Sequence, residues 1–299
     1  MNDLRVLYIG MLGEFSRRPL PALLAAGITV VGVCVPSVEK VPGIRQLEPV
    51  TAVSQLPILT PFAAPNLIHT AWEHHIPVWA IGRLGAEIAQ LLRELTPDVA
   101  CVACFDQRIP AKILATPRYG FLNVHPALLP DFRGPAPLFW TFRAGITETG
   151  VTVHFMDDGL DTGDIALQAP LSLPDGISGP AADALAADLG GQLLIEAITK
   201  LQAGTLTRRP QGANGRSYPS PQPADFHIPT RWPARRAFNF MRGTASWARP
   251  FIIETDSERM VAKTAVAYSA QGQLPYPVTH DNGRTHIQFS PGILTIAAD

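Results

Sequence analysis

The sequence predicts an α/β protein in which a large, mostly parallel sheet is followed by a small C-terminal β-barrel domain. Near its start the chain passes from an apolar strand to a helix and back to a strand, which is typical of a βαβ unit. A proline- and glycine-rich segment at 208–233 then interrupts the periodicity. The apolar runs beyond this segment are short and separated by turns, a pattern that favours a small barrel.

The elements of the first region follow from the spacing of apolar residues. The expected strands are apolar runs, as in a sheet that is covered on both faces. The expected helices carry apolar residues three or four positions apart and end near glycine or proline. We expect strands at 4–10, 28–35, 77–80, 98–105, 121–125, 150–156 and 165–173. We expect helices at 14–26, 67–75, 86–95, 135–145 and 178–201.

The second region contains one expected helix, at 234–242, and several short strands. These strands are expected at 251–254, 260–267, 285–289 and 292–297. The predicted organisation is a first domain at 1–204, a linker at 205–233 and a small barrel-like domain at 234–299. Charge supports this division, because the first domain has 13 Lys and Arg against 19 Asp and Glu, whereas the rest has 11 against 6. A net positive second region would tolerate a polyanion.

Composition excludes several classes of protein. Hydrophobic residues make up 46% of the 299 residues and charged residues 16%, as expected of a folded chain and not of a disordered one. Three cysteines are too few for a secreted fold built on disulfides. The start lacks a signal-peptide pattern, and no apolar run approaches the ~20 residues that span a bilayer. We therefore expect a soluble cytoplasmic protein with no membrane partner.

Two motifs that resemble known sites are interpreted as structural. Cys101 and Cys104 form a CxxC inside an expected strand, where residues three apart point to opposite faces. A redox CxxC requires a helix N-terminus, so we interpret both as cysteines buried in the sheet. The three histidines of His69–His75 match no common zinc spacing, which favours a solvated helix face. The glycine fingerprint of a nicotinamide enzyme is also absent after the first strand.

Asn123 and His125 form a candidate site. Residues two apart in a strand share a face, so the amide and the imidazole project side by side. Pro126 ends the strand directly after the histidine, which places both side chains at its carboxyl end. Open α/β sheets bind their ligands at that edge. A hydrogen-bonded structural pair is the alternative interpretation of an isolated Asn-x-His.

The loop at 156–165, MDDGLDTGDI, holds four carboxylates and no basic residue. These charges need partners from elsewhere in the chain, water, or calcium. Calcium is the second interpretation, because the loop lacks the terminal glutamate of an EF-hand. A carboxylate of this loop that reached His125 would fix the tautomer of its imidazole.

The stretches NVHPALLPDFRGPAP and ETGVTVHFMDDGLDTGDI together strongly resemble the folate-dependent formyltransferase family. The family pattern is N-x-H-x-S-L-L-P, an R-G loop, T-G-V-T and D-x-G-x-D-T-G, and this chain departs from it at Ala127, where serine is usual. The resemblance covers about residues 4–204 well and 230–299 more faintly. It implies a Rossmann-like catalytic domain, an appended OB-like barrel, and 10-formyltetrahydrofolate as formyl donor without a metal.

The resemblance also implies a catalytic trio of Asn123, His125 and Asp161, the last being the aspartate of D-T-G. Asn123 and protonated His125 would donate hydrogen bonds to the oxyanion that forms when an amine attacks the formyl carbon. Asp161 would orient His125 and relay a proton, through water, from the amine to the leaving N10. The implied folate contacts are Phe105, Asp106, Arg108, Ile109, Pro110, Ala127, Leu128, Leu129, Pro130, Met156, Asp157 and Asp158.

The acceptor amine stays open between alternatives. Family members that act on methionyl-tRNA usually carry a basic, glycine-rich insertion after the second strand, whereas Pro36–Asn66 is proline-rich and nearly neutral. We nevertheless place methionyl-tRNA first and a nucleotide-linked amino sugar second. A protein that binds folate or RNA without turnover is the alternative of another class, and the intact trio argues against it.

We place tRNA first because of the arginines in the second region. They could follow phosphates along a nucleic acid, although several could instead pair with acidic residues of the first domain. These arginines are Arg208, Arg209, Arg231, Arg235, Arg236, Arg242 and Arg249.

Overall fold

The computed structural model describes residues 3–39, 41–49, 66–212 and 214–297. The chain folds into two compact units, each assembled from three separate segments. The first unit consists of Met1–Pro130, Val151–Ala169 and Ala184–Gly215. The second consists of Asp131–Gly150, Pro170–Asp183 and Arg216–Asp299. The expected domain boundaries, which divide the chain into consecutive stretches, stay a prediction.

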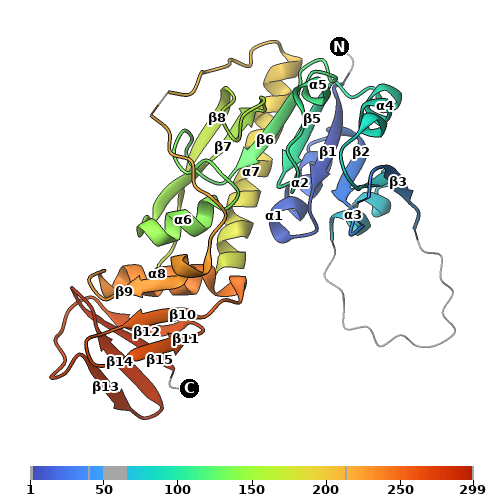
Figure 1. The fold of residues 1–299 in the computed structure, drawn as a ribbon. Helices are drawn as coiled ribbons and strands as arrows, with labels where there is room; N and C mark the ends of the chain where they lie inside the picture. Colours follow the sequence, from blue (N-terminus) through green and yellow to red (C-terminus); the bar gives the residue numbers. More distant parts are fainter. Residues whose placement is uncertain (1–2, 40, 50–65, 213, 298–299) are drawn as a thin grey trace, which may run out of the picture. The chain divides into compact units, whose positions relative to one another are not determined.

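The largest sheet in the described residues has eight strands. They are β1 Arg5–Gly10, β2 Thr29–Pro36, β3 Ile44–Leu47, β4 Val78–Ile81, β5 Val99–Ala103, β6 Phe121–His125, β7 Glu148–Phe155 and β8 Ile165–Ser172. Their order is β3-β4-β2-β1-β5-β6-β7-β8 (Figure 1). The strands β4, β2, β1, β5 and β6 run parallel, whereas β3 is antiparallel to β4 and β7 to β6. The predicted mostly parallel sheet is confirmed.

The helices agree with the expected positions, apart from one division and the additional short helix α5. They are α1 Glu14–Arg17, α2 Pro19–Ala25, α3 Leu67–Glu73, α4 Ala86–Leu95, α5 Ala111–Leu114, α6 Pro137–Ala144, α7 Gly179–Gln202 and α8 Ala234–Thr244. The expected helix at 14–26 is two helices, because Pro19 lacks the N–H that a continuous helix would need and instead begins α2. The short elements β3 and α5 have too few apolar residues to be read from periodicity.

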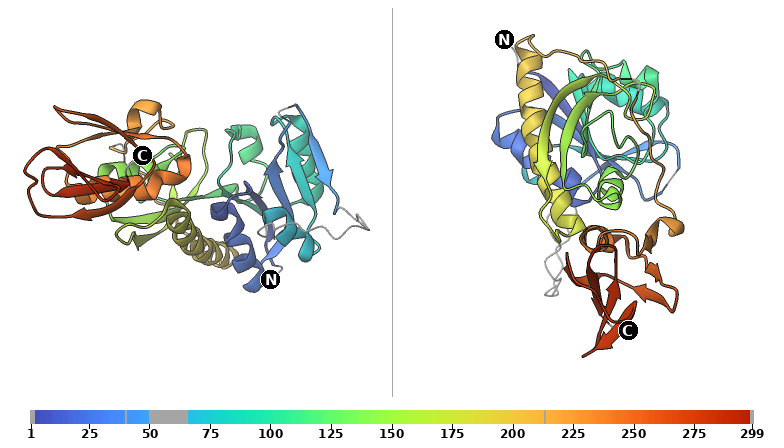
Figure 2. Two further views of the ribbon diagram at one scale, coloured as in Figure 1. Left: turned by 90° about the horizontal axis from the view of Figure 1, so that it is seen from below. Right: turned by 90° about the vertical axis from the view of Figure 1, so that its left-hand side faces the viewer.

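The helix α7 packs against one face of β6. In the middle of this helix, a Cβ at Gly190 would lie 2.4 Å from Val124 Cγ1, and one at Gly191 would lie 3.2 Å from Pro19 Cα. The two glycines therefore allow α7 to approach both β6 and α2, and Figures 1 and 2 show α7 beside them. This packing covers one face of β6 and leaves Asn123 and His125 on the other.

The C-terminal strands form two sheets in the described residues. The strands are β9 His227–Pro229, β10 Phe251–Glu254, β11 Arg259–Ala262, β12 Ala265–Ser269, β13 Val278–Asp281, β14 Arg284–Gln288 and β15 Ile293–Ala297. One sheet has the order β11-β10-β9 and the other β12-β15-β14-β13. The expected strand at 260–267 is thus two strands that belong to different sheets. The predicted fold class, an α/β sheet followed by a small β domain, is confirmed.

Aromatic side chains form the core of the second unit. The rings of Phe139 and Phe226 have centroids 5.3 Å apart, as do those of Phe139 and Phe240, and Phe240 lies 5.6 Å from Phe251. The last three of these side chains are fully buried. Packing of α6 and α8 through these rings gives the unit a core of its own.

Two expectations concern segments that are only partly described. Of Pro36–Asn66, residues 50–65 lie outside the described residues, and 44–47 form β3. The expected linker contains β9, and its start pairs with β8, since Ile165 and Arg209 exchange backbone hydrogen bonds of 2.8 and 3.0 Å. None of the helices in the described parts has the length and apolarity that crossing a bilayer requires.

Candidate active site

Asn123 and His125 lie at the carboxyl end of β6, as the sequence predicts. The strand ends at His125, and only 4% of this residue is exposed. The antiparallel neighbour β7 places His154 opposite Asn123 and Thr152 opposite His125. These four side chains share one face of the sheet, because paired residues in neighbouring strands point the same way.

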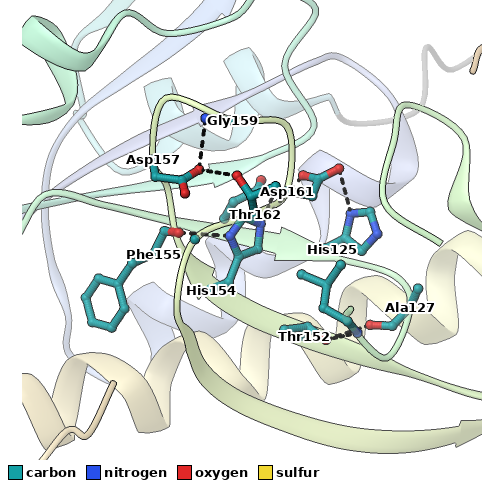
Figure 3. Close-up of polar contacts among 12 residues, drawn as sticks. His125, Ala127, Thr152, His154, Phe155, Asp157, Gly159, Asp161 and Thr162 are labelled. Atoms are coloured by element: carbon teal, nitrogen blue, oxygen red, sulfur yellow. Dashed lines mark hydrogen bonds and ion pairs between the residues drawn. The ribbon is translucent and has the colours of Figure 1, made fainter. Parts of the chain in front are cut away.

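Thr152 holds the turn that follows β6. Its hydroxyl donates to the Ala127 carbonyl at 2.6 Å and accepts from the Leu129 N–H at 3.1 Å. Gln168 of β8 donates to the same hydroxyl at 2.9 Å and to the Leu129 carbonyl at 2.8 Å. The turn beside His125 is therefore tied to two strands of the sheet, and Figure 3 shows Thr152 next to Ala127 of this turn.

Asp161 meets His125 from the loop between β7 and β8. Its Oδ2 lies 3.7 Å from His125 Nδ1, and 9% of its side chain is exposed. The backbone of Asp161 is left-handed, with φ at 56°, a conformation that Asp adopts more readily than most residues. Figure 3 shows the carboxylate directed at the imidazole. The structure thus brings the predicted trio together within one unit.

The local sequence DDGLDTG accounts for the path of this loop. The Asp157 carboxylate accepts hydrogen bonds from the Gly159 N–H at 3.0 Å and from the Thr162 hydroxyl at 2.7 Å, which closes the loop on itself. A Cβ at Gly163 would lie 1.8 Å from the Phe155 carbonyl oxygen, so only glycine fits there. The glycine of the D-T-G pattern therefore has a steric cause.

Gln211 clamps the same loop from the expected linker. Its Nε2 donates to the Asp161 carbonyl at 2.9 Å and to the Gly163 carbonyl at 2.7 Å. Arg209, two residues earlier, pairs with β8 through its backbone and with Gln168 through its side chain. Sequence reasoning missed Gln211 and named Arg209 only as a candidate phosphate contact, because their segment has no periodicity and their partners lie more than 40 positions away.

His154 is a second residue that sequence reasoning missed. Its Nε2 lies 3.1 Å from Asn123 Nδ2 and 3.6 Å from Asp161 Oδ1, and its Nδ1 lies 2.9 Å from the Phe155 carbonyl oxygen. Only 2% of this residue is exposed. A signal was present, since a histidine within an apolar strand is a polar group that needs buried partners.

Three of the four carboxylates of the loop have different partners and do not converge on one point. Asp157 stays within the loop, Asp161 faces the two histidines, and Asp158 pairs with Arg108 at 2.9 Å. Within 3–39, 41–49, 66–212 and 214–297, no group of three or more His, Cys, Asp or Glu is arranged to hold a metal. The calcium interpretation has no support from this geometry.

A pocket of about 270 Å³ lies beside the loop, in the first unit. Three of the expected folate contacts line it: Met156, Asp157 and Asp158. The other lining residues were not predicted from the sequence, and they are Ala111, Leu114, Ala115, Tyr119, Gly120, Phe121, Phe155 and Arg208.

Arg208 is placed at this pocket by stacking. Its guanidinium lies 3.7 Å from the centre of the Phe155 ring, a cation–π contact, and its side chain is exposed. It makes no hydrogen bond or ion pair with a described residue. The pocket thus combines apolar side chains, two carboxylates and one cation that has no hydrogen bond or ion pair with the described residues.

The remaining expected folate contacts lie around the pocket and the trio without lining the pocket. Ile109 is buried in the cluster that also contains Leu114 and Phe121, and Phe105 packs against this cluster. Asp106, Arg108 and Pro110 are exposed in the same loop. Ala127, Leu128, Leu129 and Pro130 form the turn after β6, next to His125.

The two motifs interpreted as structural are partly as expected. Cys101 is buried in β5, and burial raises the pKa of its thiol to about 12. Cys104 lies one residue beyond β5, is exposed and has a left-handed backbone with φ at 64°, so its expected burial is wrong. The strand ends earlier than the apolar run. His69, His74 and His75 are exposed, as expected, although only His69 lies within α3 and the other two follow it.

The trio supplies three chemical functions at one point. The Asn123 amide can donate to an oxygen that gains negative charge. His125 can donate as an imidazolium, which the Asp161 carboxylate stabilises. The carboxylate can also accept and return a proton. Such a set suits a reaction that passes through a tetrahedral oxyanion and needs one proton transfer.

Comparison with known proteins agrees with this chemistry. The family model described as formyl transferase matches residues 72–198. A methionyl-tRNA formyltransferase of Synechococcus sp. (strain JA-3-3Ab) is 36% identical over 245 residues, which cover 80% of this chain and 71% of that protein. One of Pelotomaculum thermopropionicum is 35% identical over 82% of this chain and 73% of that protein.

Solved structures share the fold. The N-formyltransferase of Helicobacter canadensis, in complex with folinic acid and dTDP-3-aminofucose, has a TM-score of 0.66 at 16% identity, and 98% of each chain is covered. HypX of Aquifex aeolicus, in complex with tetrahydrofolic acid, has a TM-score of 0.62 at 13% identity, with 99% of this chain and 44% of that chain covered.

Proposed function

Since the chain belongs to the formyl transferase family, we propose that it transfers the formyl group of 10-formyltetrahydrofolate to a primary amine, with methionyl-tRNA as the leading acceptor. One observation carries the proposal. Asn123, His125 and Asp161 come from β6 and from a loop some 36 residues later, and they meet at the edge where α/β sheets bind ligands.

The proposed reaction forms one bond and breaks another at the formyl carbon. The acceptor nitrogen attacks this carbon, and the carbonyl oxygen becomes an oxyanion. Asn123 and the imidazolium of His125 donate hydrogen bonds to it, each contributing roughly 3–4 kcal/mol to the stability of the transition state. The bond from carbon to N10 then breaks, and N10 receives the proton that the amine lost.

Asp161 serves this reaction in two ways. Its carboxylate, 3.7 Å from His125 Nδ1, favours the charged imidazole that the oxyanion needs. It also relays the proton from the amine to N10 through water. The left-handed backbone of Asp161 and the clamp by Gln211 hold the carboxylate in place.

The donor is proposed to bind between the trio and the pocket beside Asp158. The apolar side chains of Leu114 and Phe121 suit an aromatic bicycle, and backbone groups of the loop at Met156 suit its polar edge. Arg208 would meet an anion, and the donor carries carboxylates on its glutamate tail. The twelve folate contacts predicted from the sequence form part of this proposal.

The acceptor is the open part of the proposal. Curated relatives that act on methionyl-tRNA support the leading choice at 36% identity. The nucleotide-linked amino sugar is favoured by another observation, the coverage of 98% in both directions with the Helicobacter canadensis enzyme.

Several arginines offered for tRNA already have partners in the second unit. Arg235 pairs with Asp175 at 2.8 Å, and Arg242 donates to the Gly176 carbonyl at 3.3 Å. Arg236 stacks on Trp232 with its guanidinium 3.8 Å from the ring centre. Because of these contacts, fewer arginines are available to bind the phosphates of tRNA. The nucleotide-linked amino sugar therefore remains the alternative acceptor.

Release of tetrahydrofolate from 10-formyltetrahydrofolate tests the proposal. The assay is run with charged methionyl-tRNA, with a panel of nucleotide-linked amino sugars, and without acceptor. Release that only methionyl-tRNA stimulates would support the leading choice, and stimulation by a sugar alone would replace it. Affinity for tRNA should also fall steeply as salt rises if arginines bind phosphates. If no acceptor stimulates release of tetrahydrofolate and none occurs without acceptor, a protein that binds folate or RNA without turnover would be favoured.

A further inference from the structure

His154 is a buried polar residue of the site that the proposed reaction does not use. We propose that His154 is a positioning residue: its neutral imidazole accepts a hydrogen bond from Asn123 and thereby fixes which end of the amide faces the formyl oxygen. The inference rests on the proposed function, because it explains how the oxyanion donor Asn123 is oriented.

The tautomer of His154 follows from its partners. Nδ1 lies 2.9 Å from the Phe155 carbonyl oxygen, which can only accept, so Nδ1 carries the hydrogen. In a neutral imidazole Nε2 then has a lone pair. Nε2 lies 3.1 Å from Asn123 Nδ2, within hydrogen-bond reach, and 3.6 Å from Asp161 Oδ1, beyond it. The nearest partner of the lone pair is therefore the Asn123 amide.

This hydrogen bond selects one of two orientations of the amide. When the amide nitrogen of Asn123 faces His154, one of its N–H groups donates to Nε2 and the second can donate to the oxyanion. In the flipped orientation the amide oxygen would face the Nε2 lone pair, and two acceptors would repel each other. The flipped amide would also present its oxygen, and not a donor, to the formyl oxygen.

The charge of His154 matters as well, because Asp161 lies between two imidazoles. Its Oδ2 is directed to His125 and its Oδ1 to His154, while the two rings have centroids 6.4 Å apart. A protonated His154 would donate to Asp161 and would favour the flipped amide of Asn123. A neutral His154 leaves the carboxylate to His125, which is the imidazole that needs a positive charge.

Substitutions separate this role from a merely structural one. His154→Gln keeps an uncharged oxygen that can accept from Asn123, whereas His154→Phe keeps the volume without an acceptor. His74→Gln, on an exposed histidine after α3, is the matched control. The rate constant kcat, the KM for 10-formyltetrahydrofolate and the thermal midpoint Tm are measured for each variant.

We expect His154→Phe to lower kcat by about 100-fold, the loss typical of one oxyanion donor, with a donor KM within about threefold of the unmodified enzyme. His154→Gln should recover most of this loss. Equal impairment of both variants, or near-normal turnover of both, would overturn the inference.

A measurement independent of turnover separates this inference from the proposed function. NMR of the unmodified protein with ¹⁵N-labelled histidine reports which ring nitrogen of His154 carries the hydrogen. A hydrogen on Nδ1 alone at neutral pH is expected. A hydrogen on Nε2, or on both nitrogens, would overturn the inference even in an active enzyme. Absence of formyl transfer by the unmodified protein would instead refute the proposed function.

Discussion

The carboxylate of Asp161 lies 3.7 Å from Nδ1 of His125, although 36 positions separate the two residues in the sequence. Both side chains are almost completely buried, with 9% and 4% of their surface exposed. A buried carboxylate beside an imidazole favours the imidazolium, because the opposite charge replaces lost hydration. In the proposed reaction, this pair makes His125 a charged hydrogen-bond donor.

Asp161→Asn should lower turnover by two or more orders of magnitude while tetrahydrofolate binding stays largely intact. The amide keeps the size of the side chain but removes the charge that stabilises His125, and it cannot relay a proton. Steady-state kinetics and the Kd for tetrahydrofolate test this, with the exposed Asp188→Asn as control. Near-normal turnover of the variant would remove the assigned role.

Gln211→Ala should reduce kcat by roughly 10- to 100-fold, because small displacements of a catalytic group have effects of this size. The substitution removes the donors that hold the Asp161 and Gly163 carbonyls at 2.9 and 2.7 Å. Gln90→Ala, on the exposed face of α4, is the control. If kcat stays unchanged in Gln211→Ala, the clamp has no catalytic importance.

Arg208→Met should raise the KM for 10-formyltetrahydrofolate by about tenfold with little change in kcat. Methionine retains packing on Phe155, whereas the cation proposed to meet the glutamate carboxylates is lost. The effect should weaken at high salt, since an exposed ion pair is screened. A donor lacking the glutamate tail provides a second test, because its KM should respond little to the same substitution. An equal rise for both donors would contradict this assignment.

Asp183→Asn should stabilise the fold more at pH 7 than at pH 4. Burial raises the pKa of the Asp183 carboxyl to about 6, from an ordinary value of 3.8. Between these values the folded state binds more protons than the unfolded state, so stability falls as pH rises through this interval. The amide avoids this loss, which amounts to about 1 to 3 kcal/mol at neutral pH. Thermal unfolding of the variant and of the unmodified protein at pH 4 and pH 7 measures this difference in stability. An equal gain in stability at both pH values would contradict the prediction.

Local patterns in the sequence determined much of the fold and part of the site. Asn123 and His125 had to share a face because side chains alternate along any strand. The boundaries of α4 and β10 follow from apolar spacing and agree with the structure. The strand β3, which escaped prediction, is short and has an exposed centre, so no pattern of burial marks it.

Tertiary structure alone decided how the rest of the site assembles. The pairing of Asn123 with His154 depends on the register between β6 and β7, which no local spacing specifies. The hydrogen bond from the Gln211 side chain to the Asp161 carbonyl joins residues 50 positions apart. Such contacts depend on where the whole sheet brings distant segments together. The sequence by itself therefore determined which side chains could act, and only the folded chain decided their orientation and their partners.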